Sequence, residues 1–353
     1  MTTNTSEPSL TLTSPADILA AIPYLVGFHP VDSLIVIGLA GGQAKVAARW
    51  GLPFPPGTLA PLTALFDREE VAQVVLVGYG PGERVTPAVD EARAVAARAG
   101  VEVGEALRAD GGRFWSYVCD SARCCPPEGT PYDSSGSRIA AEATVRGLVA
   151  LPDRQALERT IAPVTGPVRT AMRQATAAAV HEFLAGLEAA ADPDAFARRF
   201  VAQGLARVRS ALSAGDRLDD AEAARLGLDL AVIRVRDEAW TRLTPCHTDL
   251  WKDLTRRLEP ALVPPAASLL AMAAWRSGDS VLAGIALERT LAIDPGYSMA
   301  NLLRHALAHL ISPSAVKGRL PTPAELDTAM GEPHVGWLAS LLALSDELGR
   351  PAD

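Results

Sequence analysis

Three cysteines, Cys119, Cys124 and Cys125, lie close together in one short segment of the chain. Thiolates bind Zn²⁺ and can also pair as a disulfide, which Cys119 could form easily with either neighbour by closing a short loop. A C-x4-C-C spacing is not a recognised zinc-knuckle spacing, and adjacent cysteines are expected to point apart. Because free cysteines are among the most buried residues, we expect structural thiols first, a redox pair second and zinc third. We therefore expect no cofactor, and we add Glu128 of the same loop to the candidate ligand residues.

A glycine-rich turn, 78–82, is the second candidate site. Gly78 and Gly80 follow an apolar run and precede a helix, which is the context in which a glycine loop cradles phosphate. However, Pro81 removes an N–H donor, and Glu83 stands where a dinucleotide fingerprint has its third glycine. We therefore favour an ordinary strand-to-helix loop and keep the two glycines as ligand-binding candidates.

Two histidine patterns could also do chemistry. His29, Asp32 and Ser33 have the residue types of a hydrolytic triad, but one local turn cannot aim all three at one substrate atom. His305 and His309 lie four apart on an expected helix and could bind one metal ion, but the glutamate of an H-E-x-x-H motif is missing. We keep His29 and Asp32 as candidates and interpret the other two histidines as residues of a helix flank.

The N-terminal part must position these residues on strands and helices. The runs 33–39 and 71–77 are rich in β-branched residues, which predicts strands buried on both faces. A helix that we expect to begin at Thr86, with Pro87 in its first turn, separates the second run from a strand signal at 101–103. This order is a βαβ unit and predicts at least one parallel strand pair. The fold class is thus an α/β N-terminal sandwich, with a mixed sheet and helices.

The composition changes after this part. Ala-rich stretches with helical periodicity, separated by proline and glycine, predict an all-α helical domain over 151–345. The α/β domain is expected over 14–150, beginning with a helix that Ser14 caps. We expect the polar residues 1–13 to be disordered.

The segment 266–297 resembles a single tetratricopeptide repeat. Gly278-Asp279 fits the turn of this motif, and Asp294-Pro295 fits its exit. No second copy follows about 34 residues later, and such repeats need about three copies to bury their faces. A helical hairpin that packs on its own domain is therefore favoured over a peptide-binding array.

Three blocks of the chain, 14–34, 115–129 and 274–297, carry a wider resemblance. The first includes Gly27-Phe28-His29-Pro30, and the second includes Cys124-Cys125-Pro126-Pro127-Glu128-Gly129. As a set they resemble the actinobacterial family catalogued as domain of unknown function 4192. The resemblance implies an actinobacterial, cytoplasmic protein, and it supplies no activity, cofactor or catalytic residue.

Charge and composition exclude several classes of function. The chain has 33 Lys and Arg against 41 Asp and Glu, a net charge of -8, which argues against sequence-independent nucleic-acid binding. No apolar run approaches the ~20 residues of a membrane span, and the N-terminus has no secretory signal. With only 4 cysteines, we expect a soluble, acidic protein of the reducing cytoplasm.

Two function classes remain. We prefer a non-enzymatic binding or regulatory module that acts through protein–protein contacts of its helical half. The alternative is an enzyme with small-molecule or thiol-dependent chemistry, whose site lies between the 78–82 loop and the 119–128 loop. Ligands of α/β sheets bind beyond the carboxyl ends of strands, from which both loops emerge. The oligomeric state does not follow from the sequence.

Overall fold

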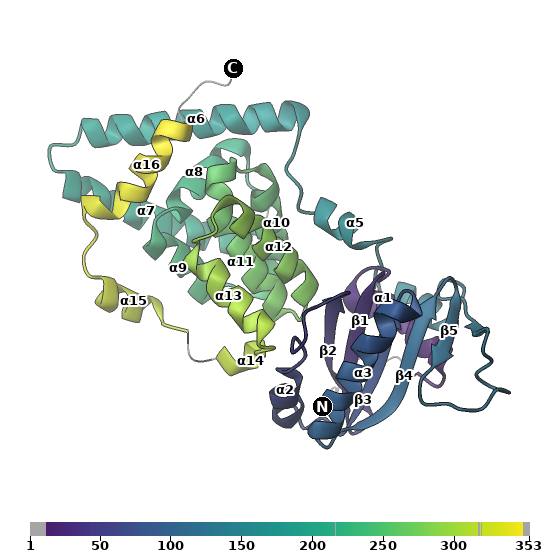
Figure 1. The fold of residues 1–353 in the computed structure, drawn as a ribbon. Helices are drawn as coiled ribbons and strands as arrows, with labels where there is room; N and C mark the ends of the chain where they lie inside the picture. Colours follow the sequence, from purple (N-terminus) through teal and green to yellow (C-terminus); the bar gives the residue numbers. More distant parts are fainter. Residues whose placement is uncertain (1–11, 216, 317, 319, 349–353) are drawn as a thin grey trace, which may run out of the picture. The chain divides into compact units, whose positions relative to one another are not determined.

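The computed structural model describes residues 12–215, 217–316, 318 and 320–348. The chain divides between Leu157 and Glu158 into two compact units, which we call the N-terminal unit and the helical unit. Figure 1 shows a sheet with helices in the first and helices alone in the second. The sequence predicts disorder for residues 1–13, and residues 1–11 of that segment lie outside the described residues.

The N-terminal unit is built around a mixed six-stranded sheet in the order β2-β1-β3-β4-β5-β6. The β3–β4 pair is parallel and every other neighbouring pair is antiparallel, so the predicted mixed sheet with one parallel pair is confirmed. Along the chain, the elements are α1 (Pro15–Val26), β1 (Ser33–Ala40), β2 (Gln43–Gly51), α2 (Leu62–Arg68), β3 (Gln73–Tyr79), α3 (Gly82–Arg98), β4 (Glu102–Asp110), β5 (Arg113–Ser116), β6 (Thr130–Pro131) and α4 (Arg138–Val145). Helix α5 (Arg154–Arg159) spans the boundary between the two units.

Local sequence signals set the start of this unit. Ser14 caps α1, since its hydroxyl oxygen accepts the backbone N–H of Asp17 at 3.2 Å. Gly27 ends the helix with φ of 83°, a conformation that glycine adopts without strain. Strand β1 is buried over its first six residues, as its β-branched composition predicts, and Gly41-Gly42 forms the hairpin to β2.

Helix α3 begins earlier than its sequence predicts. It starts at Gly82, so Pro87 lies inside the helix, and the expected cap at Thr86 is wrong. The hydroxyl of Thr86 instead contacts that of Tyr117 at 2.7 Å. Val85 is fully buried, and its Cγ1 would lie 2.1 Å from a Cβ placed on Gly78 of β3. Close packing of Val85 on the sheet therefore favours the earlier start over the local proline signal.

The helical unit has no strand among its described residues, which confirms the predicted helical half. None of the described helices is long and apolar enough to cross a membrane. Its elements are α6 (Gly166–Glu188), α7 (Pro193–Ala214), α8 (Asp220–Leu230), α9 (Ile233–Arg242), η1 (Pro245–His247), α10 (Thr248–Arg257), η2 (Pro260–Leu262), α11 (Val263–Arg276), α12 (Ser280–Ile293), α13 (Ser298–Ala308), α14 (Pro313–Val316), α15 (Pro323–Met330), η3 (Val335–Leu338) and α16 (Ala339–Leu348).

Helix α11 forms the core of this unit. Every residue from Val263 to Trp275 is buried, because α11 contacts α8, α9, α10, α12 and α13. A turn at Gly278 leads to α12, where the Asp279 side chain accepts the backbone N–H of Leu282 at 2.9 Å. The helical hairpin expected at 266–297 thus corresponds to α11 and α12, and its assignment to the tetratricopeptide motif stays a prediction.

Candidate functional site

The loop between β5 and β6 carries the three neighbouring cysteines, and β5 holds its far end. The Arg113 guanidinium donates to the carbonyl oxygens of Glu128 and Gly129, each at 2.7 Å. The Trp115 indole N–H donates to the carbonyl of Pro127 at 2.9 Å. These three bonds fix the path of the loop without using any sulfur atom.

The three thiols lie together at the surface. All Sγ atoms of Cys119, Cys124 and Cys125 lie within 4.8 Å of one another, and those of Cys119 and Cys124 are 3.0 Å apart. The adjacent Cys124 and Cys125 donate their backbone N–H groups to one carbonyl, that of Ser121, at 3.1 and 2.8 Å. The expectation that adjacent cysteines point apart is therefore wrong, because this turn directs both toward Cys119.

These thiols are also more exposed than expected. Cys124 is exposed, and Cys119 and Cys125 are half-buried, so the usual burial of free cysteines does not hold here, and the role as structural thiols stays a prediction. Among the described residues, no histidine or carboxylate joins the group, and Glu128 therefore lies outside it. All three residues are free thiols, so the chemistry open to this group is that of neighbouring sulfur atoms, which is disulfide formation or metal binding.

The thiols influence one another's protonation. The hydrogen bond from Cys119 lowers the pKa of the Cys124 thiol, with a further contribution from Ser121. The contact with Cys119, together with burial, raises the pKa of Cys125 to about 12. These contacts therefore favour the thiolate of Cys124, whereas Cys125 keeps its proton at neutral pH.

In the 78–82 loop, one candidate backbone donor is already used within the fold. The N–H of Gly80 donates to the Ala109 carbonyl at 2.9 Å. Gly80 has φ of 126°, and a Cβ there would lie 2.8 Å from an oxygen of Asp32. Both candidate glycines thus serve close packing, since Gly78 makes room for Val85.

Packed side chains connect the 78–82 and 119–128 loops, between which the enzyme alternative places its site. Arg108 of β4 lies over the Trp115 ring, 3.7 Å from its centre. Its Nη1 would be 2.5 Å from a Cβ on Gly82, and the same indole would be 2.6 Å from one on Gly129. The loops therefore belong to one packed region, in which the stacked Arg108 and Trp115 lie between them.

The local triad candidates take part in contacts of the fold. The carboxylate of Asp32 pairs with Arg84 at 2.8 Å. The Ser33 hydroxyl donates to the Val31 carbonyl at 2.8 Å and accepts from Arg49 at 3.1 Å. His29 is half-buried, and its backbone N–H donates to the Leu151 carbonyl at 2.9 Å. These contacts stabilise the entry to β1, in agreement with the doubt that one turn forms a triad.

The histidines of α13 contact each other. The rings of His305 and His309 stack with their centres 3.9 Å apart. The Nδ1 atom of His309 lies 3.0 Å from the backbone oxygen of His305, so it faces its own helix. This arrangement agrees with the interpretation of a helix flank.

The structure shows a pocket in the helical unit that sequence reasoning missed. Its volume is about 600 Å³. Its lining residues come from the segment before α6, from α6 itself, from the α10–η2 junction and from α12. They are Glu158, Ile161, Ala162, Pro163, Arg169, Leu258, Pro260, Ile285, Glu288, Arg289, Ala292 and Ile293. The one sequence signal is the charged pair Glu288-Arg289 within an otherwise uncharged helix.

The two arginines of the pocket have different partners. Arg169 donates to the Glu259 carboxylate at 2.6 Å, so its charge is compensated. Arg289 is half-buried and donates to the backbone carbonyl of Ile161, the one acceptor that the described residues give it. Burial, and then the charge of Arg169, lower the pKa of Arg289. Arg289 is therefore a cation that an added anion would stabilise.

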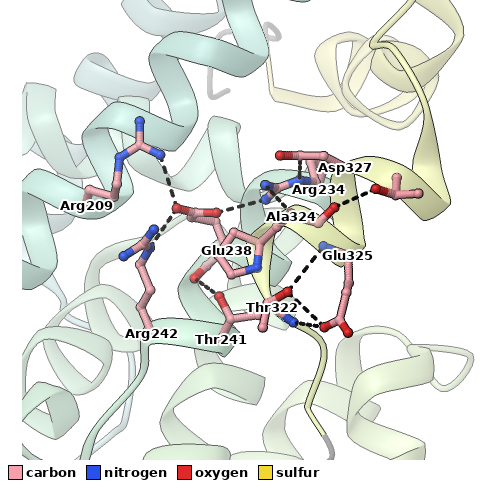
Figure 2. A network of polar contacts seen from close by, with 11 residues as sticks. Arg209, Arg234, Glu238, Thr241, Arg242, Thr322, Ala324, Glu325 and Asp327 are labelled. Atoms are coloured by element: carbon pink, nitrogen blue, oxygen red, sulfur yellow. Dashed lines mark hydrogen bonds and ion pairs between the residues drawn. The ribbon is translucent and has the colours of Figure 1, made fainter.

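A second charged cluster connects α9 with α15 in the helical unit (Figure 2). Glu238 is fully buried and accepts hydrogen bonds from Arg209, Arg234 and Arg242 at 3.1, 3.0 and 2.7 Å. Arg234 also pairs with Asp327 of α15 at 2.7 Å. Since the guanidinium groups all have carboxylate partners, this cluster stabilises the fold and offers no group to a ligand.

The fold and these sites define a two-unit protein, in which a mixed-sheet α/β unit with a surface group of three thiols precedes a helical unit with its own pocket. The chain belongs to the family described as Domain of unknown function (DUF4192), whose model matches residues 15–314. Searches of curated proteins and of solved structures gave no match. The protein partner and the enzyme alternative considered for this chain both stay predictions.

Proposed function

We propose that the helical unit binds a small molecule that combines an apolar body with an anionic group. A pocket of about 600 Å³ has the size of small-molecule sites, and eight of its twelve lining residues are apolar. The observation that carries the proposal is the half-buried guanidinium of Arg289, which has a backbone carbonyl as its acceptor and no carboxylate among the described residues.

An anion fits this pocket better than a neutral head group. Burial and the nearby charge of Arg169 disfavour the Arg289 cation, as the lowered pKa of Arg289 indicates. A carboxylate or similar anion beside Arg289 would stabilise its cation through a charge-assisted hydrogen bond. The described lining has no serine, cysteine or histidine, and its two glutamates, Glu158 and Glu288, both have partners of their own, which supports a binding role over a catalytic one.

Octanoate and octan-1-ol are matched probes of this function, because they share an apolar chain and differ in charge. Calorimetric titration of the full-length protein should show octanoate binding at least about 10-fold more tightly, the effect of one hydrogen bond to a charged group. Equal affinities for the two probes, or no binding of octanoate, would contradict the proposal.

Variants separate the role of the charge from that of the apolar wall. In Arg289→Met the apolar stem stays and the cation is lost, so we expect the preference for octanoate to disappear while octan-1-ol binds unchanged. Arg198→Met is the matched control, since this exposed arginine pairs with Asp192 and does not line the pocket. If the control variant loses the preference to the same extent, the pocket is not the binding site.

A further inference from the structure

The convergence of three thiols in the N-terminal unit calls for an explanation that a disulfide does not give. A disulfide uses two sulfurs, whereas Cys119, Cys124 and Cys125 all direct their Sγ atoms to one point, within 4.8 Å of one another. Tetrahedral zinc with Zn–S bonds of about 2.3 Å holds its sulfurs about 3.8 Å apart. The Cys119–Cys124 separation of 3.0 Å is shorter than that value, and no two of the three sulfurs are more than 4.8 Å apart.

The loop is shaped for these positions by contacts that do not involve sulfur. The Ser121 carbonyl accepts the N–H groups of both adjacent cysteines, and Arg113 and Trp115 hold the carbonyls that follow. Apolar burial contributes little here, because residues 120–124 are all exposed. The polar contacts thus pre-arrange three soft ligands at the surface, as a metal site requires.

We propose that Cys119, Cys124 and Cys125 bind one Zn²⁺ ion as three thiolates, with the fourth position open to water. On binding, the three thiols release their protons to the buffer and three S–Zn bonds form, without any change of oxidation state. The site lies in the N-terminal unit and is independent of the pocket proposed above. A three-thiolate site with an open position is the arrangement in which zinc can still take an outside ligand.

Metal binding can be measured directly on the full-length reduced protein. Native mass spectrometry after zinc addition and desalting should show one zinc per chain. Titration with Cd²⁺ should give a sulfur-to-metal absorption band in the ultraviolet that saturates at one equivalent. Competition with a chelator gives the affinity. A failure to retain zinc, together with no saturating Cd²⁺ band, overturns the proposal.

Single cysteine variants test the ligand set. Cys119→Ser, Cys124→Ser and Cys125→Ser should each weaken zinc binding by at least about 100-fold, more than the loss of an outer partner does. Cys246→Ser is the matched control, because this exposed cysteine of η1 contacts Thr244 in the helical unit and should leave the affinity unchanged. An equal loss in the control would show that the metal binds elsewhere.

Two further measurements separate zinc binding from other outcomes. Circular dichroism should show every variant folded, and a variant that fails this test is replaced by the corresponding alanine variant. Peptide mapping without reductant identifies any Cys119–Cys124 disulfide. A disulfide that forms in air, in a protein that takes up no zinc after reduction, would overturn the metal site in favour of a redox pair.

Discussion

At the scale of single residues, the helical unit depends on buried charges that have several partners. Glu238 is fully buried and accepts from three arginines (Figure 2). Removing the buried carboxylate of such a cluster takes one counter-charge from each arginine, which destabilises more than the loss of an exposed pair.

We expect Glu238→Ala to lower the free energy of unfolding by about 1–3 kcal/mol, because the buried Arg234 would lose one of its two carboxylate partners and keep only Asp327. Glu182→Ala is the control, since this glutamate is 78% exposed and pairs with Arg225 at 3.6 Å. The control should change stability by less than about 0.5 kcal/mol. Urea denaturation measures both, and equal effects would contradict the structural role of the cluster.

The same residue predicts a pH dependence. Burial raises the pKa of Glu238, but the hydrogen bonds from Arg242 and Arg234 outweigh it, and the pKa is lowered overall. The folded protein therefore binds fewer protons at this site than the unfolded chain, so the stabilisation exists above the unfolded pKa and is lost as the pH falls through the folded pKa. Urea denaturation from neutral to acid pH should show that the difference in free energy of unfolding between wild type and Glu238→Gln becomes smaller as the pH falls. A constant gap would contradict this assignment.

At the scale of elements, the packing of α3 on the sheet decides where the helix begins. Fully buried Val85 lies over Gly78, where a Cβ would be 2.1 Å from its Cγ1. The β3 backbone at Gly78 lies closer to the Val85 side chain than it could if residue 78 carried a Cβ. The strand and the helix therefore fit together only with glycine at this position.

We expect Gly78→Ala to destabilise the N-terminal unit by about 1–3 kcal/mol through overpacking. Adding Val85→Ala to this variant should recover part of the loss, because the space then accommodates the new methyl group. Gly284→Ala is the control in α12, where a Cβ meets no atom within 4 Å, and it should stabilise the protein by up to about 1 kcal/mol. Thermal melts give all three values, and a Gly78→Ala protein as stable as wild type would rule out this packing.

Elements beyond the family match also belong to the helical unit. The match ends at residue 314, yet α15 contacts α9, and η3 contacts α7. Thr322 and Glu325 form a capping box at the start of α15, and the N–H of Val335 donates to Asp194 at 2.9 Å. This C-terminal segment is thus held by specific polar contacts.

At the scale of the whole molecule, the two proposed sites belong to different units. The three cysteines precede Leu157, and the residues that line the pocket follow it. Each site is built from the residues of one unit alone.

We therefore expect zinc and octanoate to bind independently. Calorimetric titration of octanoate with and without saturating zinc should give the same dissociation constant within about 2-fold, because coupling needs differential contacts in two states. Hydrogen exchange should show protection by zinc in residues 117–129 and by octanoate around α12. A larger change in affinity would show that the two sites are coupled.

Several features follow from the sequence because they depend on neighbouring residues. Ser14 and Gly27 specify the ends of α1 through local hydrogen bonding and a positive φ. The β-branched run that begins at Ser33 specifies a buried strand, and the strand–helix–strand order specifies the parallel pair. Alanine-rich periodic stretches likewise specify the helical half. These features need no knowledge of distant contacts.

Other features depend on residues that only the fold brings together. The start of α3 depends on Val85 meeting Gly78 in another element, and the direction of the adjacent cysteines depends on a turn around the Ser121 carbonyl. The pocket joins Ile161 to Arg289, which lie more than a hundred residues apart in the chain. Spacing along a sequence reports neighbours within one element, whereas a site made of several elements depends on how their surfaces pack. The cysteine cluster was therefore visible in the sequence, while its convergence and the pocket were decided by tertiary structure.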